Sequence, residues 1–212
     1  MNRGVSKLFI YSDTKSIMCH SIKMIAILPY QLRKAPFTFK EAIAAGLTQY
    51  RLRLLLNSGE IERVERGLYA AAYQEPSDET LFIRATKRVG APAVVCLLSA
   101  LSHYELTDAI PKQVWLMVPK EKRVKSTSIK LYRARDPMWR VGVISHGSYS
   151  ITTIERTIVD ALTRKALISP RMGIDALKRA IATKKTTATK VLHLASAMGV
   201  HHRVFPYVEA LS

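Results

Sequence analysis

The sequence predicts an α+β fold in two parts, a small N-terminal unit and a larger mixed α/β domain. Short helical patterns with N-cap residues lie between about residues 36 and 58, and a short strand-like stretch follows them. Farther along, apolar runs of strand length alternate with amphipathic stretches of helix length, which is typical of a mixed α/β domain. With 48% hydrophobic and 23% charged residues, the 212-residue chain has the composition of a globular protein.

The first part begins with two short helical patterns separated by a glycine. Thr38 precedes Glu41 by three residues, which is the spacing of a capping box at a helix start. We expect this helix to end at Gly46, because glycine adopts the left-handed conformation that follows many helices. Thr48 is the next candidate N-cap, and residues 49–57 carry leucines on one face. Two helices joined by so short a turn predict a helix-turn-helix.

A short strand pair is expected directly after the second helix. Residues 60–69 contain apolar positions at Ile61, Val64 and Leu68 and a turn at Gly67. A ribbon at this place converts a helix-turn-helix into a winged one. The fold class predicted for the whole chain is therefore a winged helix-turn-helix followed by a mixed α/β C-terminal domain.

The second helix and the wing carry polar and basic side chains suited to DNA. Arginine can bond guanine through two hydrogen bonds and glutamine can do so with adenine, while threonine and the free N–H groups of a helix start suit a phosphate. The predicted DNA-binding residues are Thr48, Gln49, Tyr50, Arg51 and Arg53 on the helix and Arg63 and Arg66 on the wing. The alternative is a small winged domain that contacts proteins and whose arginines are merely solvated.

A basic surplus favours a polyanionic partner. Lysine and arginine total 33 against 16 acids, a formal charge of +17. Such a surplus costs stability through self-repulsion, which nucleic acid, an anionic membrane or an acidic protein would offset. Residues 1–73 hold 11 basic and 5 acidic residues and residues 74–212 hold 22 and 11, so most of the positive charge lies in the second part.

The domain boundaries follow changes in pattern along the chain. Residues 1–15 lack periodicity and are expected to be a disordered extension, and residues 16–34 suggest a helix disturbed near Pro29. The assignment is residues 16–73 to the winged helix-turn-helix, 74–77 to a linker with an N-cap at Ser77, and 78–212 to the α/β domain. In that domain, helices are expected at residues 81–89, 96–106, 153–165, 170–183, 186–198 and 203–211, and strands at 113–118, 129–133 and 141–146.

Residues 120–135 form a strongly basic segment, with seven basic residues and one acid, Glu121. The basic residues are Lys120, Lys122, Arg123, Lys125, Lys130, Arg133 and Arg135. The segment could extend a nucleic-acid footprint or meet an acidic partner, or it could be a solvated loop between two strands, and the sequence leaves both open. Residues 129–133 alternate as a strand does, so the strand pattern at least partly explains why a polar residue, Lys130, stands at this position.

Catalytic and metal-binding patterns are weak. The aspartates at 108, 136, 160 and 175 do not form the carboxylate pair plus lysine with which metal-dependent nucleases hold Mg²⁺. The histidines at 193, 201 and 202 lack a cysteine or a carboxylate at matching spacing. We therefore expect no enzyme, no cofactor and no metal site.

The cysteines and the apolar stretches favour a cytoplasmic protein. Cys19 and Cys96 lie far apart without metal or disulfide spacing, which is typical of reduced thiols. Residues 17–32 are too short and too interrupted to cross a bilayer, and they lack the cleavage site of a signal peptide. No membrane partner is expected.

Three strings resemble AbiEi-type antitoxins of bacterial type IV toxin–antitoxin systems. Residues 37–69, with the wing ending Arg63-x-x-Arg66-Gly67-Leu68-Tyr69, are similar to the winged helix of that family. Residues 98–116 and 151–161 are similar to its second domain, and the resemblance covers roughly residues 36–200. Arg156 and Asp160 belong to the last string, and their four-residue spacing leaves open whether they pair with each other or hold a helix against the sheet.

The resemblance implies two roles on one chain. The N-terminal domain would bind promoter DNA and repress its own operon, and the C-terminal domain would neutralise a nucleotidyltransferase-like toxin, which itself carries the nucleotide chemistry. Our first hypothesis is such an antitoxin and autorepressor. The second is a regulator without a toxin partner, in which residues 78–212 sense a ligand or mediate assembly. The third is an enzyme, such as a nuclease with a winged targeting domain.

Overall fold

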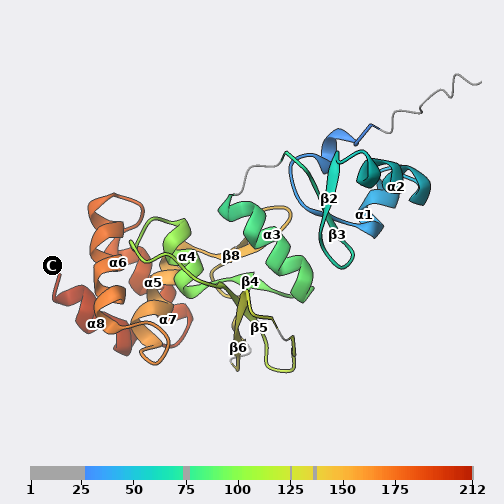
Figure 1. The fold of residues 1–212 in the computed structure, drawn as a ribbon. Coiled ribbons are helices and arrows are strands. Elements are labelled where there is room, and N and C mark those ends of the chain that lie inside the picture. The colour runs from blue at the N-terminus through green and yellow to red at the C-terminus, as the bar shows by residue number, and fades with distance from the viewer. Residues whose placement is uncertain (1–26, 74–76, 125, 136–137, 212) are drawn as a thin grey trace, which may run out of the picture.

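The computed structural model describes residues 27–73, 77–124, 126–135 and 138–211, and within them it has eight α-helices and two sheets. The predicted α+β class is confirmed. A three-stranded sheet lies with the first two helices, and a five-stranded sheet lies with the other six (Figure 1). The expected extension 1–15, the first part of the helix expected at 16–34 and most of the linker 74–77 lie outside the described residues.

The smaller, N-terminal unit contains two helices and a three-stranded antiparallel sheet of order β1-β3-β2. Its elements are the 3-10 helix η1 (Tyr30–Leu32), β1 (Phe37–Thr38), α1 (Phe39–Ala44), α2 (Gln49–Asn57), β2 (Ile61–Glu65) and β3 (Leu68–Ala71). Leu28, Leu32 and Phe37 pack with the buried residues of the two helices to form its core. In the described part of the helix expected at 16–34, residues 27–34, only η1 forms, because Pro29 precedes it with a fixed φ and no N–H donor.

The larger unit is built on a mixed sheet of order β6-β5-β4-β8-β7. Its strands are β4 (Val94–Val95), β5 (Val114–Pro119), β6 (Ile129–Ala134), β7 (Val143–Ser145) and β8 (Ser150–Thr152). β5 runs parallel to β6 and β4 parallel to β8, and the other neighbours are antiparallel. The short strands β1, β4 and β8 are not predicted by the sequence, because runs of two or three residues carry no alternating pattern.

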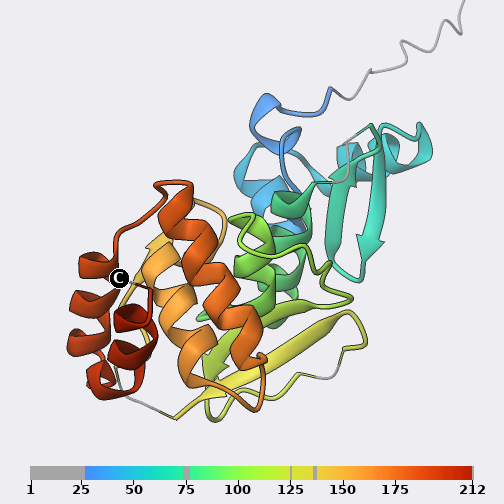
Figure 2. The ribbon, with the colours of Figure 1, turned by 90° about the vertical axis from the view of Figure 1, so that its left-hand side faces the viewer.

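Helices cover both faces of this sheet. α3 packs Phe82 and Ile83 against one face, which includes Leu116 of β5. Met117 faces the other side, because successive strand residues point to opposite faces, and it packs with the remaining helices. The helices are α3 (Asp78–Val89), α4 (Leu97–His103), α5 (Ile154–Thr163), α6 (Pro170–Ala182), α7 (Ala188–Ala197) and α8 (His201–Glu209). The C-terminal helices and the N-terminal unit therefore lie at opposite ends of the molecule (Figures 1 and 2).

The six helices expected in the second part are present with shifted ends. α3 begins at Asp78, three residues before the expected 81, directly after Ser77, whose side chain caps it as predicted. α4 ends earlier than the expected 106, since Glu105 adopts a φ of 57° and leaves the helix.

A buried charge network holds α5 against the sheet. Arg156 and Asp160 are each 1% exposed, and Arg156 Nε donates to Asp160 Oδ2 at 2.9 Å. Arg164 Nε donates to the other carboxylate oxygen at 3.0 Å. The Arg156 guanidinium also donates to the backbone carbonyls of Trp139 and Val141, in the segment before β7. Arg156 and Asp160 therefore pair with each other, and Arg156 also holds the helix against the sheet through the Met117 sulfur of β5, 3.6 Å from its Nη2.

Candidate nucleic-acid interface

Side-chain caps fix the starts of α1 and α2. The Thr38 N–H donates to Glu41 Oε2 at 2.7 Å and Thr38 Oγ1 accepts from the Glu41 N–H at 3.3 Å, so the predicted capping box is present. Gly46 then adopts a φ of 85°, which returns the buried Leu47 to the core. The Arg51 N–H donates to Thr48 Oγ1 at 3.2 Å, so Thr48 is the predicted N-cap of α2.

α2 buries one face and exposes the other. Leu52 and Leu55 are buried in the N-terminal core. The predicted residues on this helix are all exposed, and they are Thr48, Gln49, Tyr50, Arg51 and Arg53. At about 100° per residue, Tyr50 and Arg53 point away from the buried leucines, while Arg51 lies on the flank.

Asn57 extends this exposed face, and the sequence analysis missed it. It is exposed and lies four residues after Arg53 and seven after Tyr50, so it shares their side of the helix. The helical period alone would have identified it. Together, Tyr50, Arg53 and Asn57 form a polar face with one aromatic ring.

The β2–β3 hairpin displays the two arginines predicted on the wing. Arg63 lies opposite Tyr69, and the strand register shifts between Arg63 and Glu65 in a β-bulge. Arg66 and Gly67 form the two-residue connection, where Gly67 adopts a φ of 78° with open space around it. Arg63 and Arg66 are both exposed. Contact of these arginines with DNA stays a prediction.

Two basic residues of α3 connect the larger unit to the N-terminal unit. Lys87 Nζ lies 2.7 Å from both carboxylate oxygens of Glu41 and 2.8 Å from the Pro36 carbonyl oxygen. Arg88 Nη1 donates to Glu65 Oε2 at 2.6 Å. The sequence analysis missed both, because partners 46 and 23 residues apart carry no local signal.

Glu41 therefore serves the α1 cap and the contact between the units at once. Burial by itself would raise the pKa of Glu41, but hydrogen bonds from Lys87 and Thr38 outweigh it and hold the pKa below its ordinary value of 4.5. The Glu41 carboxylate is thus charged at neutral pH and can accept hydrogen bonds from both Thr38 and Lys87.

The described basic residues of the segment 120–135 lie at two ends of β6. Lys130 lies near the start of β6 with its ammonium 4.2 Å from the centre of the Trp115 ring, whereas Arg133 lies near the end of the strand. Lys122 Nζ donates to the Ala91 carbonyl at 3.2 Å, and Arg133 Nε donates to the Lys122 carbonyl at 3.2 Å. Lys122 and Arg133 thus use part of their hydrogen-bonding capacity on backbone carbonyls of the protein itself.

The other described basic residues of the segment are exposed, as Lys130 and Arg133 are. Lys120, Arg123 and Arg135 are exposed, and Arg123 donates to the carbonyls of Lys120 and Lys122. Lys125 lies outside the described residues. The segment thus divides between Lys130 at one end of β6 and Arg133 and Arg135 at the other.

Metal-binding clusters and membrane-spanning helices are both absent from the described ranges. No group of three or more His, Cys, Asp or Glu side chains there could hold a metal ion. No helix in those ranges is long and apolar enough to cross a membrane. Cys96 is buried, and burial raises the pKa of its thiol far above the ordinary value.

Comparison with known proteins gives one family and one fold. Residues 27–72 match the family model described as transcriptional regulator, AbiEi antitoxin. The crystal structure of the RV2827C protein from Mycobacterium tuberculosis is similar, with a TM-score of 0.54, 14% identity and coverage of 83% of this chain and 72% of that chain. At this identity the likeness shows a common fold alone. No curated protein matches the chain.

Proposed function

We propose that this protein, whose residues 27–72 match the AbiEi antitoxin family of transcriptional regulators, binds DNA and acts as an antitoxin. In this proposal, residues 16–73 are a winged helix-turn-helix domain, 74–77 a linker and 78–212 the second domain. The protein is cytoplasmic and represses its own operon by binding promoter DNA. The second domain neutralises a nucleotidyltransferase-like toxin, as in type IV systems.

The exposed face of α2 carries the DNA-binding part of the proposal. Its N-terminal half presents Tyr50, Arg51 and Arg53 beside the N-cap Thr48. In helix-turn-helix proteins the first residues of the second helix contact base edges in the major groove. Arg63 and Arg66 on the adjacent hairpin are suited to the phosphate backbone, because contact there needs charge rather than a base-specific pattern.

The test of the α2 assignment is promoter binding by a double variant, Arg51→Ala with Arg53→Ala. Each good bidentate base contact contributes about 1–3 kcal/mol of discrimination, so we expect affinity for the upstream promoter to fall by roughly tenfold or more. Fluorescence anisotropy with labelled promoter DNA measures it. The matched control is Lys184→Ala with Lys190→Ala, which removes the same charge from exposed positions of the second unit. Unchanged affinity in the arginine variant contradicts the assignment.

The wing is tested separately through salt dependence. We expect Arg63→Ala and Arg66→Ala to weaken binding to promoter and scrambled duplexes alike. The slope of the logarithm of the binding constant against the logarithm of the salt concentration should become shallower by about 1 for each DNA phosphate that the variant no longer neutralises. Fewer counterions are then released on binding. Weakening confined to the promoter sequence would instead assign these arginines to base contacts.

Toxin neutralisation is tested by co-expressing the full chain with the neighbouring downstream gene. We expect the full chain to restore growth, and the double variant Arg51→Ala with Arg53→Ala to restore it equally, because the toxin-binding role is assigned to the other domain. A downstream gene that does not impair growth would remove this part of the proposal and leave promoter binding standing.

A cleft beside Lys87 favours one alternative, a regulator whose second domain senses a ligand. The cleft has a volume of about 540 Å³, and Lys87 and Ser148 also line a smaller cavity against the N-terminal unit. A ligand there would contact the lysine that holds Glu41. Promoter affinity that changes with a small molecule, in cells without a toxic downstream gene, would support this alternative.

A further inference from the structure

A strongly basic pocket lies between the edge strand β6 and the C-terminal helices. Its volume is about 480 Å³, and four arginines line it: Arg133 in β6, Arg135 directly after that strand, Arg164 at the end of α5 and Arg203 in α8. None of the described residues that line it is an acid. Three separate elements thus direct guanidinium groups toward one space.

Among the described residues, Asp160 is the acid that pairs with one of these arginines, and it compensates little of their charge. Asp160 is buried and accepts hydrogen bonds from both Arg156 and Arg164, so its single negative charge is divided between two guanidinium groups. Arg133, Arg135 and Arg203 add three further positive charges at the pocket. Like charges gathered in this way repel one another, and a bound anion would relieve that repulsion.

Arg133, Arg164 and Arg203 are held in place and still have donors to offer. Arg133 Nε donates to the Lys122 carbonyl and Arg203 to the Thr163 carbonyl. The Arg164 guanidinium lies 4.5 Å from the centre of the Tyr132 ring. Each anchoring hydrogen bond uses one of the five N–H donors of its guanidinium, so most donors remain for a ligand. Side chains fixed before binding lose less entropy on binding.

We propose that this pocket binds a nucleoside polyphosphate. Planar guanidinium groups bond phosphate oxygens in pairs, and several arginines suit a chain of phosphates better than a single carboxylate. Met198 and Val200 supply an apolar wall for a base, and the volume lies within the usual range of ligand pockets.

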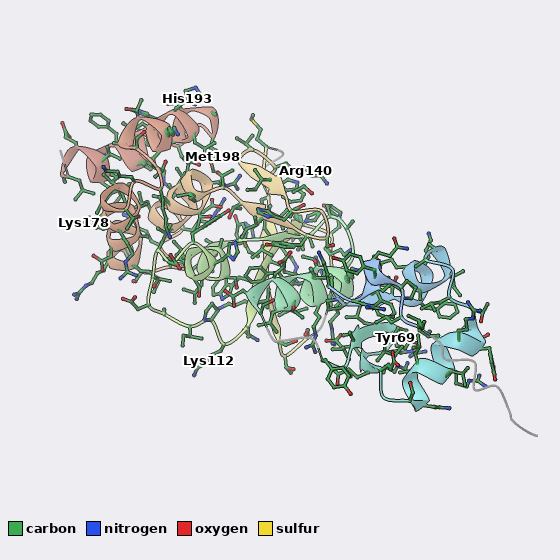
Figure 3. All side chains as sticks on the ribbon, turned by 90° about the horizontal axis from the view of Figure 1, so that it is seen from above. Tyr69, Lys112, Arg140, Lys178, His193 and Met198 are labelled. Atoms are coloured by element: carbon green, nitrogen blue, oxygen red, sulfur yellow. The ribbon has the colours of Figure 1, made fainter. Side chains whose placement is uncertain are left out.

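The position of the pocket separates it from the α2 surface. Figure 3 shows Met198, at the pocket, among the C-terminal helices and well apart from Tyr69 in the N-terminal sheet. The pocket is therefore not a continuation of the proposed DNA-contacting face. Its ligand is independent of whether α2 binds promoter DNA.

The experiment measures binding of ATP, inorganic triphosphate and a short scrambled DNA duplex to the full chain by calorimetry. The variant is Arg135→Glu, and the matched control is Arg171→Glu, which makes the same charge change at a side chain 93% exposed on α6. Thermal unfolding of both variants verifies that they are folded. We expect ATP and triphosphate to bind, and Arg135→Glu to weaken both by about tenfold or more while Arg171→Glu changes neither.

Three results overturn the proposal. Absence of ATP binding to the unaltered chain is the first. Equal weakening by both variants is the second, because it shows attraction to the overall charge rather than to this pocket. The third is binding of the duplex alone, weakened by Arg135→Glu, which makes the pocket part of a nucleic-acid surface. The variant Arg51→Ala with Arg53→Ala should keep full ATP affinity, so failure of the DNA-binding proposal is distinguishable.

Discussion

The carboxylate of Asp160 receives hydrogen bonds from two guanidinium groups in a space that water scarcely reaches. Arg156 is 1% exposed, and its guanidinium also donates to the carbonyls of Trp139 and Val141 and to the Met117 sulfur. Even Gly142 is part of this arrangement, because a Cβ there would lie 2.8 Å from Arg156 Cβ. The buried ion pair is thus built into the packing of α5 and the segment before β7.

Removing the charge of Asp160 should strongly destabilise the folded protein. We expect Asp160→Asn to lower the free energy of unfolding by about 3–5 kcal/mol, because it leaves the buried Arg156 without its counter-charge. Urea denaturation followed by circular dichroism measures the change. The control is Asp175→Asn, whose carboxylate is exposed and lies 3.8 Å from an exposed arginine, so no measurable change is expected there. Equal denaturation midpoints for the two variants would contradict this account.

Among the elements, α1 has only six residues and depends on its cap more than a long helix would. Thr38 and Glu41 satisfy each other's backbone N–H groups, and Lys87 keeps Glu41 ionised. The start of the helix is therefore stabilised by groups from two parts of the chain.

This coupling predicts an acid-sensitive contribution to stability. The pKa of Glu41 in the folded protein lies below its ordinary value of 4.5, so the folded state binds its proton less readily than the unfolded state. Its contribution is complete above that value and is lost as the pH falls through the lower, folded pKa. We expect Glu41→Gln to destabilise the protein by about 0.5–1 kcal/mol at neutral pH, a value reduced by solvent screening.

Urea unfolding of the unaltered chain and Glu41→Gln across a pH series measures this effect. The difference between the two should shrink as the pH falls below 4.5. A difference that stays constant into acid would mean that the Glu41 charge contributes nothing. Glu209→Gln, at an exposed position in α8, is the control.

At the scale of the whole molecule, few contacts among the described residues hold the N-terminal unit to the larger one. They include the Lys87 and Arg88 ion pairs and the packing of Ala35 against the α3 side of the sheet. Ion pairs near a surface are weak and screened by salt, whereas the apolar cores of the two units are separate clusters. The relative position of the units should therefore respond to ionic strength more than either fold does.

The variant Lys87→Met tests this response, because it keeps much of the aliphatic stem and removes the charge. We expect backbone amides of β1 and the first turn of α1 to exchange hydrogen about fivefold faster, while those of α5 are unchanged. Hydrogen-exchange mass spectrometry measures it, and Lys178→Met, at an exposed lysine of α6, is the control. High salt should bring the unaltered chain toward the variant. Equal protection in both lysine variants would show that Lys87 does not hold the units together.

Local patterns in the sequence were sufficient for the caps of α1 and α2, the turn at Gly67 and the exposed side of α2. Capping and helical period depend on residues within one or two turns, so Thr38, Glu41, Gly46 and Thr48 can be interpreted without the fold. The α+β class and most of the longer elements follow for the same reason. The shortest strands do not, because hydrogen bonds to distant neighbours define them.

Only the tertiary structure decided which distant charges meet. It placed Lys87 on Glu41 and divided the basic segment 120–135 between two ends of β6. It also gathered Arg133, Arg164 and Arg203 from three elements around one pocket. Coulombic and hydrogen-bond contacts depend on separation in space, and chain topology rather than sequence spacing sets that separation.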